Sequence, residues 1–186
     1  GGGRVLVANA GAHAVCVLSI TSGAVLSERR LDGSPCGLYY LPPHLSKCTR
    51  PSVAVALQGL AETGVPIEGV ADRSHRIEVY EYDEQAAELG DLRYRASVPL
   101  SSVELSFPNG LAAIDRTAEG GAIFACADWN HSRVAIASDE SSTARAAELF
   151  KIMHAQLPLL NRPSDCALLH DSSTLAIADH YRAGGG

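Results

Sequence analysis

The chain has 186 residues, of which 46% are apolar and 19% charged, a composition typical of a globular protein rather than a disordered one. Its formal net charge is −6, which disfavours nucleic acid as a partner because phosphate binding needs a basic surface.

The first apolar stretch, residues 5–27, contains no Asp, Glu, Lys or Arg, so a membrane span has to be considered. Asn9 and Gly11 interrupt the stretch, and its apolar residues alternate with the period of a strand. We therefore expect two strands here, at residues 4–9 and 14–19, and no membrane span. No signal peptide is visible at the amino end, and the compartment stays unassigned.

Runs of the same kind recur further along the chain. Each is short and apolar and ends in Asn, Gln or Asp, whose side chain suits a turn because it can bond nearby backbone. The later runs span residues 53–58, 122–128 and 174–179, and further strands are expected at 75–82 and 133–138. Asn9, Asp128 and Asp179 are interpreted as turn caps.

A second pattern opens an apolar strand after a loop that contains proline. It reads Pro35-Cys36-Gly37-Leu38, Pro108-Asn109-Gly110-Leu111 and Pro163-Ser164-Asp165-Cys166. Matching strands lie roughly 50–70 residues apart, and the wide gap is explained by residues 59–74, which we interpret as a surface-loop insertion. Residues 142–156 fit either a strand or a helix.

A repeat of this length, with several strands in each unit, is typical of a propeller or a solenoid. We predict an all-β fold, a β-propeller of four-stranded antiparallel blades, with three, four, four and two strands along the chain. About three to three and a half blades are then present, in a single, partial propeller domain over residues 1–186. Since a piece of a propeller leaves open sheet edges, we also expect self-association.

Five cysteines are present, and no two of them are spaced as Cys-x-x-Cys. They are Cys16, Cys36, Cys48, Cys126 and Cys166. Because several lie inside apolar strand-like runs, we expect buried free thiols, and a disulfide between two of them is the alternative.

Two resemblances add to this reading. Residues 5–41 resemble propeller repeats of the YVTN and NHL type, through Val7-Ala8-Asn9 and Gly33-Ser34-Pro35. Residues 77–181 resemble the superfamily of gluconolactonases, senescence marker proteins, paraoxonases and strictosidine synthase-like proteins, chiefly through Phe107-Pro108-Asn109-Gly110-Leu111 and the strands around it. The second resemblance implies a six-bladed propeller with a divalent metal, usually calcium, at the channel mouth, where lactones, esters or organophosphates are hydrolysed.

Asn109 and Asp165 are the candidate metal ligands, since the resemblance matches them to the family's metal-binding Asn and Asp. Both lie at the start of the predicted inner strand of neighbouring blades, so their oxygens could converge on one axis, and calcium prefers oxygen ligands. Cys36 stands where another family ligand, usually Asn, is found, and a thiol is a poor ligand for a hard cation. The family's first-blade acidic ligand has no counterpart in this sequence.

Other catalytic signatures are absent from the sequence, which has no GxSxG, P-loop, HExxH or zinc-spaced Cys/His cluster. His131 and His180 are expected in blade loops, where either could be a general base or simply an exposed histidine. Trp129, the only tryptophan, is expected to pack between blades or to line a binding face. Asn130-His131-Ser132 is a glycosylation sequon.

Two functions stay open on this evidence. The first is a degenerate or partial calcium-dependent lactonase or esterase-like hydrolase acting on a small ester or lactone, for which no catalytic residue can be named. The second is a non-catalytic scaffold that presents its loops to a protein partner. Asn109 with Asp165 favours the first, whereas Cys36 and the missing acid favour the second.

Overall fold

The fold is known from a computed structural model of the chain. It describes residues 3–45, 50–59, 75–96, 98, 105–116, 121–138, 146, 148–149, 160–169 and 174–180. The strands are β1 (Arg4–Asn9), β2 (Ala14–Ser19), β3 (Val25–Arg30), β4 (Ser34–Leu41), β5 (Ser52–Gln58), β6 (Arg76–Asp83), β7 (Glu88–Ala96), β8 (Pro108–Arg116), β9 (Ala122–Asp128), β10 (Arg133–Ser138), β11 (Pro163–Leu168) and β12 (Leu175–Asp179). Two short 3-10 turns, η1 (Ala10–Ala12) and η2 (Pro43–Leu45), lie between them.

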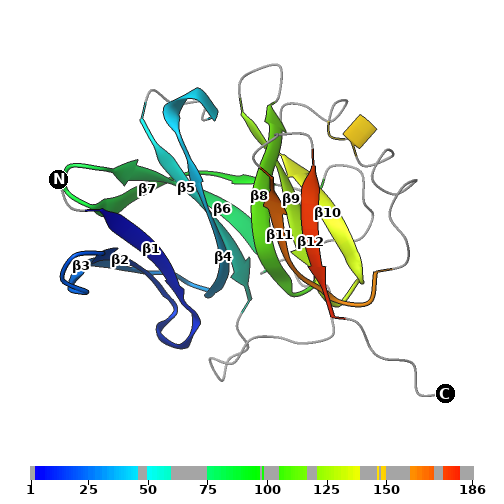
Figure 1. Ribbon diagram of the computed structural model, residues 1–186, viewed down its shortest axis with the longest axis horizontal. Coiled ribbons are helices and arrows are strands. Elements are labelled where there is room, and N and C mark those ends of the chain that lie inside the picture. Colours follow the sequence, from blue (N-terminus) through cyan, green and yellow to red (C-terminus); the bar gives the residue numbers. More distant parts are fainter. Residues whose placement is uncertain are drawn as a thin grey trace.

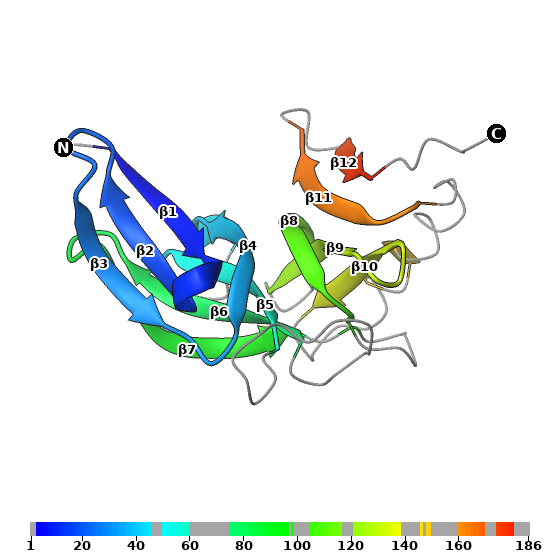
Figure 2. The same cartoon turned by 90° about the horizontal axis from the view of Figure 1, so that it is seen from below.

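These strands form four sheets that follow the order of the chain (Figures 1 and 2). The sheet orders are β1-β2-β3, then β4-β5-β6-β7, then β8-β9-β10, then β11-β12, and every neighbouring pair is antiparallel. We call them the first to the fourth sheet. The all-β prediction is confirmed, and the four sheets of the described residues follow one another along an open arc (Figure 2).

The expected strand counts hold for the first, second and fourth sheets, which have three, four and two strands. The third has three strands among the described residues, where four were expected. Its expected fourth strand falls on residues 142–156, of which only Ala146, Glu148 and Leu149 are described, and these are helical. The helical alternative therefore holds for these three positions.

Neighbouring sheets pack face to face. Because residues in a strand alternate between its two faces, each sheet offers a different set of side chains to the sheet on either side. Val15 and Val17 of the first sheet pack against Val53, Val55 and Leu57 of the second. The opposite face of the second sheet, with Ala54, Ala56, Ile77 and Val79, packs against Leu111, Phe124 and Cys126 of the third. The remaining face of the third sheet packs against Cys166 and Ile177 of the fourth.

The described cysteines are free thiols, and the disulfide alternative does not occur among them. Cys16, Cys126 and Cys166 are buried and Cys36 is half-buried. Cys48 lies outside the described residues, as do all but Gly59 of the expected surface loop 59–74. Within the described part of the chain, no helix is both long and apolar enough to cross a membrane.

Candidate functional site

The predicted inner strands begin at one common end of the sheets. Strand β4 starts opposite the last residue of β5, with Ser34 paired to Gln58. In the same way Pro108 pairs with Asp128, the end of β9, and Pro163 with Asp179, the end of β12. We call this end, where Pro35, Pro108 and Pro163 lie, the proline end. Both sequence-predicted metal ligands, Asn109 and Asp165, lie there.

Each inner strand has a bulge directly after its proline. The register shifts between Pro35 and Gly37, between Pro108 and Leu111, and between Pro163 and Asp165. Counted from these prolines, Ser164 occupies the position of Asn109, and Asp165 occupies that of Gly110. The sequence-based alignment of Asn109 with Asp165 is therefore displaced by one residue in the strand register.

Asn109 and Asp165 nevertheless lie on adjacent strands, β8 and β11, which approach closely. A β-carbon built on Gly110 would overlap the Asp165 side chain and stand 2.7 Å from the backbone nitrogen of Cys166. A β-carbon built on Gly37 would likewise overlap the backbone carbonyl oxygen of Asn109 in β8. The absence of a side chain at these two glycines is what allows the inner strands to pack this closely.

The amide of Asn109 is already engaged by another side chain. Its Oδ1 accepts a hydrogen bond of 3.1 Å from Nε2 of Gln58, which is 5% exposed. The same Nε2 donates to the carbonyl of Pro108 at 3.2 Å, and Sγ of Cys36 also donates to that carbonyl, at 2.9 Å. Burial raises the pKa of the Cys36 thiol to about 12, so at neutral pH it stays protonated and acts as a donor.

Asp165 is exposed, and its Oδ1 accepts a hydrogen bond of 2.8 Å from the backbone N–H of Cys166. Calcium takes six to eight oxygen ligands. The side chains at this position offer one carboxylate and one amide oxygen that already has a donor, with a protonated thiol beside them. In the described part of the chain, no group of three or more His, Cys, Asp or Glu side chains could hold a metal. These donors alone do not fit a calcium site.

The proline end also holds a buried acid that sequence reasoning had treated only as a turn cap. Asp128 is fully buried, and its Oδ1 accepts the backbone N–H of Ser106 at 2.8 Å. Its Oδ2 lies 2.9 Å from Nδ1 of His131 and 2.8 Å from Nε of Arg133. His131 was expected in a blade loop, and the turn after β9 folds it back onto Asp128. The feature of the sequence that could have indicated this pairing is the separation of Asp128 and His131 by three residues across a predicted turn.

A second cluster joins the third and fourth sheets at the same end. The rings of Trp129 and His180 lie with centroids 5.6 Å apart, and Cζ of Arg162 lies 5.8 Å from the centroid of the Trp129 ring. Arg162 and His180 are exposed and Trp129 is half-buried. The sequence predicted His180 in a blade loop and Trp129 either packed between blades or on a binding face, but it did not bring them together, and Arg162 was missed.

These two clusters are built on a repeated backbone arrangement. Trp129 and His180 directly follow the terminal aspartates of β9 and β12. Each donates its backbone N–H to the carbonyl of the residue before the inner-strand proline of its own sheet, Phe107 for Trp129 and Arg162 for His180. Those residues, Phe107 and Arg162, both have positive φ, at 63° and 116°. Asp179 accepts the N–H of Asn161 much as Asp128 accepts that of Ser106. The repeat fixes the backbone, and the side chains differ between blades.

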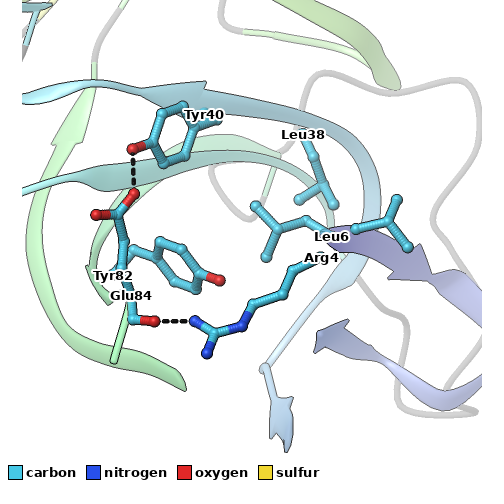
Figure 3. Close-up of a pocket in the computed structure, with 7 residues that line it drawn as sticks. Arg4, Leu6, Leu38, Tyr40, Tyr82 and Glu84 are labelled. Carbon is cyan, nitrogen blue, oxygen red and sulfur yellow. Dashed lines mark hydrogen bonds between the residues drawn. The ribbon is translucent and has the colours of Figure 1, made fainter. Parts of the chain in front are cut away.

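A separate hollow of about 620 Å³ lies at the other end of the sheets, between the first and second sheets (Figure 3). It is lined by Arg4, Val5, Leu6, Leu38, Tyr40, Tyr82 and Glu84. The hydroxyl of Tyr40 donates to the Glu84 carboxylate at 2.7 Å, and the Arg4 guanidinium donates to the Glu84 carbonyl. Partial burial and the bond to Glu84 raise the pKa of Tyr40 to about 12, so its phenol remains a donor at neutral pH.

Comparison with known proteins supports the fold and does not indicate a function. No protein-family model matches the chain, and no curated protein matches it. Among solved structures, hydrazine synthase of Kuenenia stuttgartiensis, a β-propeller-containing protein, is similar at a TM-score of 0.50 and 16% sequence identity. The likeness is one of fold. It covers 95% of this chain and 55% of that one, so this chain spans about half the length of its structural neighbour.

Proposed function

We propose that this chain is a binding scaffold of the β-propeller type, with the proline end as its partner-binding surface. The observation that carries the proposal is the cluster of Trp129, Arg162 and His180, which two neighbouring sheets present together. Tryptophan and arginine are enriched among the residues that dominate binding energy in protein interfaces. A partly covered indole beside an exposed guanidinium supplies apolar area and a directional donor in one place.

The residues around Asn109 support a scaffold over a metal-dependent enzyme. Gln58 donates to the one amide oxygen that a metal would use, and Cys36 supplies a protonated thiol where the resembled enzymes have an oxygen ligand. Both contacts stabilise the inner strands against one another. The bonds that a metal would have to displace are therefore part of the packing between the second and third sheets.

The chemistry of the cluster indicates a partner with an acidic side chain. The guanidinium of Arg162 can accept a carboxylate in a bidentate pair, because its donors form a planar fork. The Trp129 ring beside it would cover the apolar part of the same residue. We therefore expect the partner to present glutamate or aspartate next to an apolar residue on a protein segment.

The test uses Trp129 itself, because it is the only tryptophan and its emission reports what covers it. A set of synthetic peptides with a central Glu flanked by Leu or Tyr is titrated against the full chain. We expect one or more peptides to shift the emission, and Arg162→Ala to weaken that binding at least tenfold. Arg50→Ala is the matched control, since the Arg50 side chain is 67% exposed and lies just before β5, at the end of the second sheet opposite the proline end. The proposal is contradicted if peptide binding is unchanged in Arg162→Ala, or if none of the glutamate-containing peptides binds.

A calcium-dependent lactonase or esterase is the second candidate. It is favoured by the close approach of Asp165 to the strand of Asn109 and by the pairing of His131 with Asp128 at the same end. Its test is thermal unfolding in calcium and then in chelator, since a ligand that binds only the folded state raises the midpoint. This candidate would be favoured over the scaffold if calcium raises the unfolding midpoint, if the double variant Asn109→Ala with Asp165→Ala abolishes that rise, and if Cys36→Asn enlarges it.

A further inference from the structure

The hollow between the first and second sheets contains a tyrosine hydroxyl that no described residue engages. Tyr82 of β6 is 6% exposed, because its ring packs in the core between these two sheets. Its hydroxyl makes no hydrogen bond to any residue that the structure describes. Figure 3 shows this hydroxyl pointing into the hollow. Because polar groups of buried side chains normally have a partner, the partner of this one comes from whatever occupies the hollow.

Arg4 of β1 supplies a positive charge to the same hollow. Its guanidinium donates to the backbone carbonyl of Glu84 and, at 3.4 Å, to that of Gln85. These two bonds fix the side chain across the hollow, and they use only part of the donors that a guanidinium carries. Within the described part of the chain, no carboxylate forms an ion pair with Arg4. Arg4 is therefore held in place with donors left over for a ligand.

The two acids beside the hollow have donors of their own. The Glu84 carboxylate accepts the hydroxyl of Tyr40 at 2.7 Å, and Figure 3 shows it turned toward that tyrosine and away from the Arg4 guanidinium. Asp83 Oδ1 accepts two backbone N–H groups of its own turn, at 2.7 and 2.9 Å. Arg4 is thus the charged group that faces the middle of the hollow, next to the Tyr82 hydroxyl.

The remaining wall of the hollow is apolar and aromatic. Leu6 of β1 and Leu38 of β4 line it, and both are half-buried against the core between the two sheets. The rings of Tyr40 and Tyr82 stand edge to face, with centroids 6.2 Å apart. A volume of about 620 Å³ lies within the range of sites that hold small organic molecules. The hollow therefore offers an apolar surface beside one cation and one hydroxyl.

We propose that this hollow binds a small organic monocarboxylate with an apolar body. The carboxylate would accept hydrogen bonds from the Arg4 guanidinium and from the Tyr82 hydroxyl, since its two oxygens can take both donors at once. The apolar body would lie against Leu6 and Leu38. This site lies at the end of the sheets opposite the proline end, so it is separate from the proposed partner-binding surface.

Two other kinds of ligand satisfy fewer of these groups. An amine would be attracted by the Glu84 carboxylate and by the faces of the tyrosine rings, but it would be repelled by Arg4. A neutral alcohol could bond to the Tyr82 hydroxyl and would leave the donors of Arg4 unused. The charge of the ligand therefore decides between the three classes while its apolar body is kept the same.

The first test titrates the full chain by calorimetry with three compounds that share one apolar body. They are 4-phenylbutanoate, 4-phenylbutanol and 4-phenylbutylamine. We expect the carboxylate to bind about tenfold or more tighter than the other two, because only it forms charge-assisted hydrogen bonds with Arg4. Equal binding of the alcohol, tighter binding of the amine, or no binding of the carboxylate at millimolar concentration overturns the proposal.

Two variants test the donors themselves. Tyr82→Phe removes one hydroxyl that has no partner among the described residues, so it should leave the unfolding midpoint unchanged and weaken carboxylate binding about tenfold. Arg4→Met keeps the length of the side chain and should weaken binding by about the same factor or more. Arg30→Met is the matched control, because this exposed arginine lies at the opposite end of the same sheet, where it pairs with Ala14.

The last comparison separates this site from the partner-binding surface. Binding of 4-phenylbutanoate should leave the emission of Trp129 unchanged, since that residue lies at the proline end, and it should persist in Arg162→Ala. Binding that is lost in Arg162→Ala and unchanged in a folded Tyr82→Phe would assign the acid to the cluster of Trp129 and overturn the proposal. Loss in Tyr82→Phe and not in Arg162→Ala is the result that we expect.

Discussion

Asp128 Oδ1 accepts the backbone N–H of Ser106 at 2.8 Å, which ties the end of β9 to the segment that leads into β8. The same carboxylate, fully buried, also bonds to Arg133. Asp128→Ala leaves the arginine and the N–H without this partner, and breaking a buried pair from one side costs about 3–5 kcal/mol. We expect a loss of that order in the free energy of unfolding, measured by denaturant titration.

Asp179→Ala is the matched control for this prediction. Asp179 ends the equivalent strand β12 and accepts the N–H of Asn161, but it is exposed. Its loss should cost only about 1 kcal/mol, as for an ordinary hydrogen bond near solvent. Equal costs for the two variants would show that burial of the Asp128 carboxylate is not what makes it important.

Gly37 and Gly110 are the positions where the inner strands come closest. A β-carbon at either residue would overlap the neighbouring strand, so the backbones would have to move apart. Gly37→Ala and Gly110→Ala should each destabilise the fold by about 1–3 kcal/mol, as overpacking does. Gly11→Ala, which meets only Asn9 Oδ1 at 4.0 Å, should be nearly neutral by comparison.

Gln58 connects the second and third sheets through its amide. It donates to Asn109 Oδ1 and to the Pro108 carbonyl while itself 5% exposed. Gln58→Ala should lower the free energy of unfolding by about 1–3 kcal/mol, because buried acceptors lose their donor. Gln58→Glu should cost at least as much, since a carboxylate cannot donate to either oxygen. A neutral Gln58→Ala would contradict the view that this bond fixes Asn109.

The thiols make stability sensitive to alkaline pH. Burial raises the pKa of Cys36 and of Cys166 from 9.0 to about 12. Between these values the unfolded chain has lost protons that the folded chain keeps, so stability is full below pH 9 and falls toward pH 12. Each thiol adds a slope of about 1.4 kcal/mol per pH unit.

Unfolding midpoints in urea across this range measure the effect. Cys36→Ala and Cys166→Ala should each flatten the decline, while at pH 7 they show only the cost of lost packing. A pH profile that the two variants leave unchanged would mean that these thiols titrate normally in the folded chain.

The strands of this protein were predictable because their signal is local. The runs at 4–9, 14–19, 122–128 and 133–138 alternate or consist of β-forming residues, and the structure places strands at those bounds. The turn caps are also indicated by the local sequence. Asn9 Oδ1 accepts the N–H of Ala12, three residues on, so the pattern and the bond lie in one short segment.

The candidate site was less predictable because it depends on pairing between distant segments. Asn109 and Gln58 are joined across two sheets, and nothing near either residue in the sequence indicates the other. Asp165 stands one position later than Asn109 in the strand register, because Pro163 pairs with Asp179 as Pro108 pairs with Asp128, and this register is set by pairing with strands further along the chain. The contact of Arg162 with Trp129 likewise depends on how two blades meet.

The complete burial of β5 and β9 has a consequence for how this protein loses structure. Amide protons in these two strands should exchange with deuterium last, because exposing them requires a sheet to leave each side. Amides of β1 and β12 should exchange early, since one side of each is already open to water. Opening would then start at the two tips of the arc and move toward its centre, so the order of deuterium uptake would trace the blades from the outside in.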